Sequence, residues 1–188
     1  VDTGAMYRGM AIHFLDKGIR AKETDKIISA LKDAEVTIRY EEGLQQVYLN
    51  GRNITDRLRE EEVGKMASLT SAIPQVRQKL LELQKGLART QDVIMDGRDI
   101  GTCVLPYADV KIYLTASVET RAKRRYDELT EKGIACDLDE IERDIKERDE
   151  RDSTREIAPL KQAEDAVLVD SSHMTIDEVV AAIVKLCR

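Results

Sequence analysis

The sequence has little of what marks several protein classes. Its 188 residues include only three prolines and ten glycines, which argues against a collagen-like or disordered chain. The three cysteines are odd in number and widely spaced, so they exclude a disulfide scaffold and a zinc site and fit a reducing cytosol. The longest uninterrupted apolar run, 179–184, is far too short to span a bilayer. We therefore expect a cytoplasmic protein without a membrane partner.

Positive charge is also in deficit. The 30 lysines and arginines are outnumbered by 36 aspartates and glutamates, which gives a formal charge of −6 and a pI near 5.2. This balance counts against nucleic acid as a general partner. What is present is a globular composition, 42% hydrophobic and 35% charged, in a chain long enough to bury the core of one domain.

Short apolar runs at 93–95, 110–115 and 166–169 are bounded by turn residues, which is typical of buried parallel strands. Helical stretches lie between and after them, including charge-rich segments at 117–129 and 138–148. Strands that alternate with helices predict an α/β fold with a parallel sheet.

Local signals also predict where some helices begin. Pro74 occupies a first helical position ahead of an apolar stripe formed by Val76, Leu80, Leu83 and Leu87. Thr175 and Glu178 form a T-x-x-E capping box. In the N-terminal half, 6–15 and 25–31 are predicted to be helical.

Residues 36–55 interrupt the α/β alternation. Two β-rich stretches are separated by Glu42-Gly43, and a second turn signal follows at Asn50-Gly51. This pattern predicts a small inserted β-meander.

The first candidate site lies at the start of the sequence. The chain begins with Val1 rather than Met and passes directly into D-T-G at 2–4, which is typical of a strand end entering a turn. We expect a further segment upstream. The following helix start would offer backbone N–H groups to an anion, with Arg8 one turn further on. Taken alone, the motif favours an ordinary junction with a surface arginine.

A denser candidate site follows the run at 93–95. The stretch 96–102, D-G-R-D-I-G-T, supplies Asp96, Arg98 and Asp99 beside two glycines. Ligands of open α/β sheets bind at the carboxyl ends of strands, and a guanidinium can grip a phosphate. A tight turn with a local Arg–Asp pair is the alternative, but the density of polar groups favours a functional role.

Four cations fall within 121–125, a concentrated positive patch that suits a polyanion such as a triphosphate. The alternative is a solvated helix face paired with the nearby acidic residues Glu119, Asp127 and Glu128. We favour this alternative for Arg121 and Lys123. For Arg124 and Arg125 we favour a functional role, in light of the charge run that follows.

Arg148, Asp152 and Arg155 share one face of a predicted helix. The carboxylate could accept ribose hydroxyls while the arginines hold phosphate. Ordinary i,i+4 salt bridges are the alternative, and spacing alone leaves the two evenly balanced. Ser68 and Arg77, on either side of Pro74, could recognise the edge of a base, although spacing alone favours a helix-cap neighbourhood.

Five collinear motifs together resemble a known family. They are D-T-G-A-M-Y-R at 2–8, S-L-T-S-A-I-P-Q-V-R at 68–77, D-G-R-D-I-G-T at 96–102, E-T-R-A-K-R-R-Y at 119–126 and K-E-R-D-E-R-D-S-T-R at 146–155. Over essentially the whole chain, the sequence resembles the cytidylate kinases, the bacterial CMP/dCMP kinases among the nucleoside monophosphate kinases. The inserted β element matches the extra module of this family.

The resemblance implies a P-loop NTPase-like parallel sheet flanked by helices. Residues 1–8 and 86–188 would form the core domain, containing a helical lid at about 120–153. Residues 9–85 would form the NMP-binding region, with the inserted β-meander at about 36–55.

It also implies roles for matching residues. Thr3 would contact the substrate. The phosphate of CMP would be gripped by Arg8, Arg98 and Arg155. The cytosine would be recognised by Ser68, Arg77 and Asp99. The ribose hydroxyls would be held by Arg148 and Asp152.

The implied reaction is transfer of the ATP γ-phosphoryl group to CMP or dCMP by a monomer, with Mg²⁺ as cofactor. Arg124 and Arg125 would swing on the lid onto the transferring group, Arg98 would assist, and Asp96 would lie near Mg²⁺ and its waters without ligating it directly. Such a reaction needs positioning and positive charge rather than a protein nucleophile.

One family motif is absent from these residues. The Walker A loop, G-x-x-x-x-G-K-[ST], would precede D-T-G and cradle ATP. A truncated sequence, an unobserved segment and a degenerate homologue each explain this, and the non-Met start favours truncation. Two alternative functions stay open: a nucleotide-binding homologue or inactive fragment without catalysis, and a related kinase acting on another small acceptor.

Overall fold

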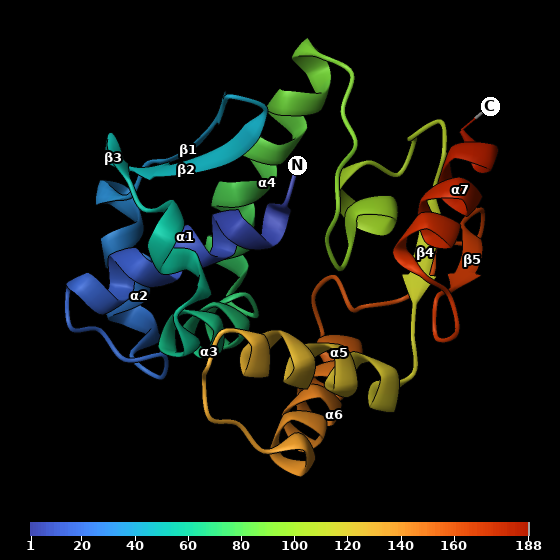
Figure 1. Cartoon of the computed structure of the whole chain (residues 1–188). Coiled ribbons are helices and arrows are strands. Elements are labelled where there is room, and N and C mark those ends of the chain that lie inside the picture. Colours follow the sequence, from blue (N-terminus) through green and yellow to red (C-terminus); the bar gives the residue numbers. More distant parts are fainter. Residues whose placement is uncertain (188) are drawn as a thin grey trace. The chain divides into compact units, whose positions relative to one another are not determined.

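The computed structural model describes residues 1–187, in which helices and two small sheets form a mixed α/β structure (Figure 1). By their contacts the residues divide into two units, Val1–Gly97 and Arg98–Arg188. The partition into a core domain and an NMP-binding region stays a prediction. No helix within the described residues is long and apolar enough to cross a membrane.

The first unit is built around α1 (Thr3–Asp16), which contacts β1, β2, α3 and α4. The Asp2 side chain caps α1 by accepting a hydrogen bond from the Ala5 N–H. The predicted helix at 6–15 is therefore confirmed, but it starts earlier than expected. Thr3 and Gly4 form its first turn rather than a loop, because Asp2 caps the helix just ahead of them.

Other helical segments surround α1 in this unit. They are α2 (Thr24–Ala30), η1 (Leu31–Asp33), η2 (Thr55–Arg59), α3 (Glu61–Thr70) and α4 (Pro74–Thr90). Pro74 is at the start of α4, as predicted, because its fixed φ suits a first helical turn. Val76 and Leu80 of the predicted stripe are buried in the core that includes α1.

The inserted β-meander is confirmed. β1 (Val36–Glu41), β2 (Leu44–Leu49) and β3 (Arg52–Asn53) pair antiparallel in that order. Both connecting turns have positive φ at their two central residues, 52° and 81° at Glu42-Gly43 and 50° and 79° at Asn50-Gly51. These are the values of the tight turn that matches strand twist in hairpins.

The second unit contains a two-stranded parallel sheet and three long helices. Its elements are η3 (Ile100–Val104, a π-helical turn), β4 (Ile112–Thr115), α5 (Val118–Glu131), α6 (Leu138–Thr154), β5 (Val167–Asp170) and α7 (Ile176–Leu186). The chain passes through α5 and α6 between the paired strands, as parallel pairing requires. The predicted capping box of Thr175 and Glu178 starts α7.

The predicted strand at 93–95 is wrong. Ile94 is 87% exposed, and this stretch contributes only an isolated bridge between Asp2 and Asp96. Beside this bridge, backbone hydrogen bonds run from the Asp96 N–H to the Val1 carbonyl, from the Thr3 N–H to the Asp96 carbonyl and from the Val1 amino group to the Ile94 carbonyl.

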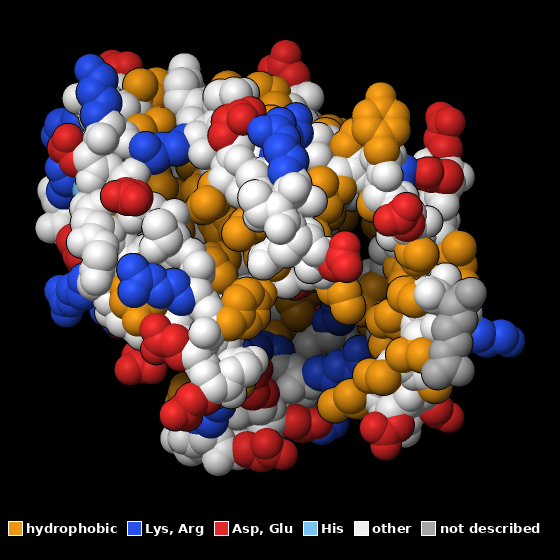
Figure 2. Space-filling view, turned by 90° about the horizontal axis from the view of Figure 1, so that it is seen from above, with side chains coloured by type: hydrophobic (Ala, Val, Ile, Leu, Met, Phe, Trp, Pro, Cys, Tyr) orange, Lys and Arg blue, Asp and Glu red, His pale blue; other side chains and the backbone are white. Residues whose placement is uncertain are grey.

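Pairing of the other two predicted strands is confirmed, but within them the predicted burial is confirmed only for Val169. Leu114 of β4 and Val167 and Leu168 of β5 are about half exposed. Figure 2 shows hydrophobic side chains at the surface of the molecule. Within the described residues each of these strands pairs on one side only, so both are edge strands, unlike the central strands of larger parallel sheets.

Candidate functional site

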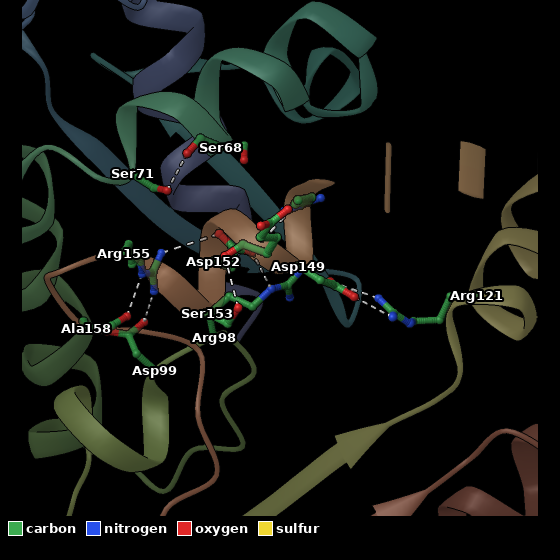
Figure 3. A network of polar contacts seen from close by, with 12 residues as sticks. Ser68, Ser71, Arg98, Asp99, Arg121, Asp149, Asp152, Ser153, Arg155 and Ala158 are labelled. Atoms are coloured by element: carbon green, nitrogen blue, oxygen red, sulfur yellow. Dashed lines mark hydrogen bonds and ion pairs between the residues drawn. The ribbon is translucent and has the colours of Figure 1, made fainter. Parts of the chain in front are cut away.

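Five of the predicted site residues meet in one polar network of the second unit (Figure 3). Two lie just before the π-helical turn, two lie on α6, and one follows the end of α6. They are Arg98, Asp99, Arg148, Asp152 and Arg155. Sequence-distant segments thus supply three guanidinium groups and two carboxylates to one place.

Asp152 is the centre of this network. Its Oδ2 accepts a hydrogen bond from Arg98 Nε at 3.2 Å and lies 3.8 Å from Arg148 Nε, while its Oδ1 lies 3.8 Å from Arg155 Nη1. The i,i+4 spacing on α6 brings Arg148 to Asp152, so the predicted shared face is confirmed. Arg98 pairs with this carboxylate, 54 residues away, and not with its sequence neighbour Asp99.

Arg155 and Asp99 are nearly buried, with 8% and 7% of their side chains exposed and 3.9 Å between Nη2 and Oδ1. Burial follows from the chain path, because Arg155 leaves the helix with ψ 142° and the Leu160 N–H turns back to the Asp152 carbonyl at 2.7 Å. Arg155 Nε also donates to the Ala158 carbonyl at 2.6 Å. Buried charges need such partners, and three cations against two anions favour an anionic ligand.

Two predicted residues of the first unit are held together at the start of α1. The Thr3 hydroxyl donates to the Asp96 carbonyl at 2.6 Å, and the Thr3 N–H donates to the same oxygen at 3.2 Å. Thr3 is buried, whereas the Asp96 side chain is exposed. Arg8 lies further along α1 and is half-buried.

Ser68 and Arg77 lie near the α3–α4 junction. Arg77 is 8% exposed, donates to the Ser71 carbonyl at 3.2 Å and lies over the Tyr7 ring at 5.6 Å. The Ser71 hydroxyl donates to the Ser68 carbonyl (Figure 3). The Ser68 hydroxyl is buried and has no hydrogen-bond partner within residues 1–187. An unsatisfied buried hydroxyl is uncommon and suits a polar ligand.

The two arginines predicted to act from the lid make other contacts. Arg124 donates to the Ser171 carbonyl at 2.7 Å, to the Ser171 hydroxyl at 3.3 Å and to the Met174 carbonyl at 3.4 Å. Arg125 donates to Glu128 at 2.9 Å. Hydrogen bonds from Lys132 and Arg125 lower the pKa of Glu128 to about 2. In the structure, the guanidinium groups of Arg124 and Arg125 therefore do not take part in the network around Asp152.

The partner predicted for Arg121 is wrong. Its guanidinium makes two hydrogen bonds to Asp149 of α6, at 3.1 and 2.6 Å, rather than pairing with a nearby acid on α5. The packing of α5 against α6 brings together these two residues, which are 28 positions apart. Helical spacing within one segment cannot predict such a pair. Sequence reasoning also missed Tyr7 and Ser71, although both lie inside motifs that it singled out.

The side chain of Asp96, the residue predicted to lie near Mg²⁺, is a carboxylate. It is exposed and is a hard oxygen ligand, and Mg²⁺ usually keeps several of its waters. No group of three or more His, Cys, Asp or Glu side chains among residues 1–187 could hold a metal ion directly.

Comparison with known proteins identifies the family. A family model described as cytidylate kinase matches residues 1–188. The cytidylate kinase of Caldicellulosiruptor saccharolyticus is 46% identical over 99% of this chain and 82% of its own length. That of Lactobacillus johnsonii is 46% identical over 100% and 82%, and that of Geobacillus sp. 44% over 99% and 83%. With the same motifs now placed in the structure, these matches show that the chain belongs to the cytidylate kinase family.

Proposed function

We propose that the protein transfers the γ-phosphoryl group of ATP to CMP or dCMP, giving ADP and CDP or dCDP. The observation that carries the proposal is the network of three arginines around Asp152. A nucleoside monophosphate offers hydroxyl donors for the carboxylate and a dianionic phosphate for the guanidinium groups.

On binding, the acceptor nucleotide would replace some of the contacts that these side chains make with one another. Its phosphate is assigned to Arg98 and Arg155, and to Arg8 of the first unit. A guanidinium can donate two parallel hydrogen bonds to a phosphate. Asp152 and Arg148 hold its ribose. A carboxylate has about four acceptor sites, so Asp152 can accept from a hydroxyl while it keeps the Arg98 hydrogen bond.

Recognition of cytosine is assigned to Asp99, Ser68 and Arg77. The exocyclic amine of cytosine donates hydrogen bonds, and its ring nitrogen and carbonyl accept them. The buried carboxylate of Asp99 suits the amine, and the buried Ser68 hydroxyl and Arg77 guanidinium suit the acceptors. Thr3 is assigned a further substrate contact.

Phosphoryl transfer itself is assigned to Arg124 and Arg125, assisted by Arg98. These two arginines would first leave their present acceptors, the Ser171 carbonyl and Glu128. Their charge would then stabilise the equatorial oxygens of the transferring phosphoryl group. Mg²⁺ bound to ATP would supply positive charge that neutralises the phosphates. Asp96 would bind the waters of that ion. We also propose a monomer, which light scattering measures.

Calorimetric titration of this chain with CMP, with UMP as the control nucleotide, tests the acceptor site. Because a carboxylate repels the carbonyl that replaces the amine in UMP, we expect CMP to bind at least tenfold more tightly, which corresponds to about 1.4 kcal/mol. Equal affinities would contradict base recognition by Asp99. A circular dichroism melt of the same sample establishes that the chain is folded.

The variant Asp152→Asn tests the ribose contact. We expect its CMP affinity to fall about tenfold or more, as loss of a hydrogen bond to a charged group predicts. The loss for dCMP should be smaller, because dCMP lacks one of the hydroxyls. Equal losses for the two nucleotides would show that Asp152 orients the arginines and does not touch the sugar.

Nucleotide binding without catalysis is the second candidate function, because the network around Asp152 suits a bound nucleotide whether or not transfer follows. Formation of CDP from ATP, Mg²⁺ and CMP, measured by ion-exchange chromatography, separates the two. Where CDP forms, Arg124→Ala should lower turnover by orders of magnitude with CMP affinity unchanged. Lys123→Ala, which removes an exposed cation of the same helix, is the matched control.

A further inference from the structure

One polar residue occupies the core-facing side of the β-meander. Along β2, residues 45, 47 and 49 share a face because side chains alternate. Val47 and Leu49 are buried in the core that includes α1. Gln45 is half-buried at the end of this face that lies next to Asp2, the residue that precedes α1. The apolar neighbours Val47 and Leu49 would predict another apolar residue at this position. A half-buried amide there needs a polar partner.

That partner is the backbone of Asp2. Gln45 Oε1 accepts a hydrogen bond from the Asp2 N–H at 2.9 Å, and Gln45 Nε2 donates to the Asp2 carbonyl at 3.4 Å. The hydroxyl of Tyr40, the residue paired with Gln45 in the sheet, donates to the same Oε1 at 3.4 Å. A carboxamide offers the donor and acceptor of a peptide group, so Gln45 pairs with Asp2 as a neighbouring strand would.

Asp2 has a second backbone neighbour. It forms a parallel bridge with Asp96, and the next residue, Thr3, donates both its N–H and its hydroxyl to the Asp96 carbonyl. The Asp2 side chain also caps α1. The short segment 1–3 is thus fixed between Gln45 and Asp96, and it carries Thr3 directly beside the residue assigned to the Mg²⁺ waters.

We propose that Gln45 is a positioning residue, through which the inserted β element holds Thr3 against Asp96 in the geometry that binds the acceptor nucleotide. The inference rests on the proposed role of Thr3 in the substrate site. It gives the β-meander a part in the reaction although its own side chains are assigned no substrate contact.

The variant Gln45→Met tests this, because methionine keeps the length and packing of the side chain and removes both hydrogen bonds to Asp2, together with the one from Tyr40. Gln46→Met is the matched control, since Gln46 lies on the opposite face and accepts a hydrogen bond from Asn53. Two quantities are measured on the full chain: hydrogen exchange at the Thr3 amide by NMR, and CMP affinity by calorimetry. For Gln45→Met we expect Thr3 exchange to be about tenfold faster and CMP affinity about threefold to tenfold weaker. Gln46→Met should change neither quantity.

Unchanged Thr3 exchange in Gln45→Met would overturn the positioning role, and so would faster exchange with full CMP affinity. If the wild-type chain binds no CMP, the proposed function fails instead, and Thr3 exchange alone then decides whether Gln45 fixes this segment. Gln45→Glu keeps the Oε1 acceptor and serves as the conservative variant, also where Gln45→Met does not fold. It should restore most of the protection at Thr3, and exchange as fast as in Gln45→Met would contradict the inference.

Discussion

The two units of the molecule bury different kinds of side chain. The first buries large apolar groups, among them Met6, Met10 and Phe14, in one continuous cluster. The buried hydrophobic residues of the second unit are few and mostly small: Val104, Ala116, Ala122 and Val169. The second unit buries the two carboxylates Asp99 and Asp152, which belong to one network, whereas the first buries a single guanidinium, that of Arg77.

This difference indicates that the first unit contributes most of the stability and the second most of the substrate recognition. Apolar burial contributes about 25 cal/mol for each Å² removed from water and has no preferred direction. A buried ion pair contributes little net stability because its groups lose their hydration, but it fixes geometry. The second unit therefore holds most of the proposed substrate contacts where apolar packing is thin. We expect the first unit to dominate the free energy of unfolding.

The largest effect should come from Phe14→Ala in the first unit. Phe14 is fully buried, and truncation of such a side chain costs about 3–5 kcal/mol. Urea unfolding followed by circular dichroism measures the loss. In the second unit, Val180→Ala on α7 removes a side chain that is about half exposed and should cost under about 1 kcal/mol. Similar losses for the two variants would break the comparison between the units.

A smaller effect is expected for Asp152→Asn in the second unit. The substitution keeps the shape of the side chain but weakens its attraction to three arginines, at a cost of about 1.5–3 kcal/mol. Hydrogen exchange along α6 measures the local loss. Asp127→Asn removes an exposed partner of Lys123 and should change stability by less than about 1 kcal/mol. An Asp152→Asn variant as stable as the wild type would show that the network carries no stability.

Features set by neighbouring residues were predictable from the sequence. Pro74 and the Thr175–Glu178 box mark helix starts, and the two turns of the β-meander carry their own conformational preference. Each of these signals acts over three or four residues. The resemblance then supplied which charged residues share a site, where spacing alone left Asp152 undecided.

Features that depend on distant partners were not predictable. Arg121 finds its carboxylate 28 residues away, and Gln45 finds a backbone 43 residues away. The apolar stretch at 93–95 has the composition of a strand, but pairing decides whether a strand forms. Composition likewise could not show that Leu114 and Leu168 stay half exposed.

The smallest effect concerns His13, a titratable group within the apolar core of the first unit. His13 is buried, and its Nε2 hydrogen-bonds to the Ala30 carbonyl at 3.0 Å. Burial lowers the pKa of His13 below its ordinary 6.5. Below about pH 6.5 the unfolded chain therefore binds a proton that the folded chain does not, so stability falls as the pH drops toward the folded pKa and then levels off.

Urea unfolding at several values between pH 8 and pH 5 measures this dependence. In His13→Gln the decline below about pH 6.5 should be shallower than in the wild type. His173→Gln is the matched control, because His173 is exposed in a loop of the second unit, and it should keep the wild-type slope. Equal slopes for all three proteins would show that His13 is protonated as readily in the folded core as in the unfolded chain. The apolar core of the first unit would then tolerate a charge, and its contrast with the charged network of the second unit would weaken.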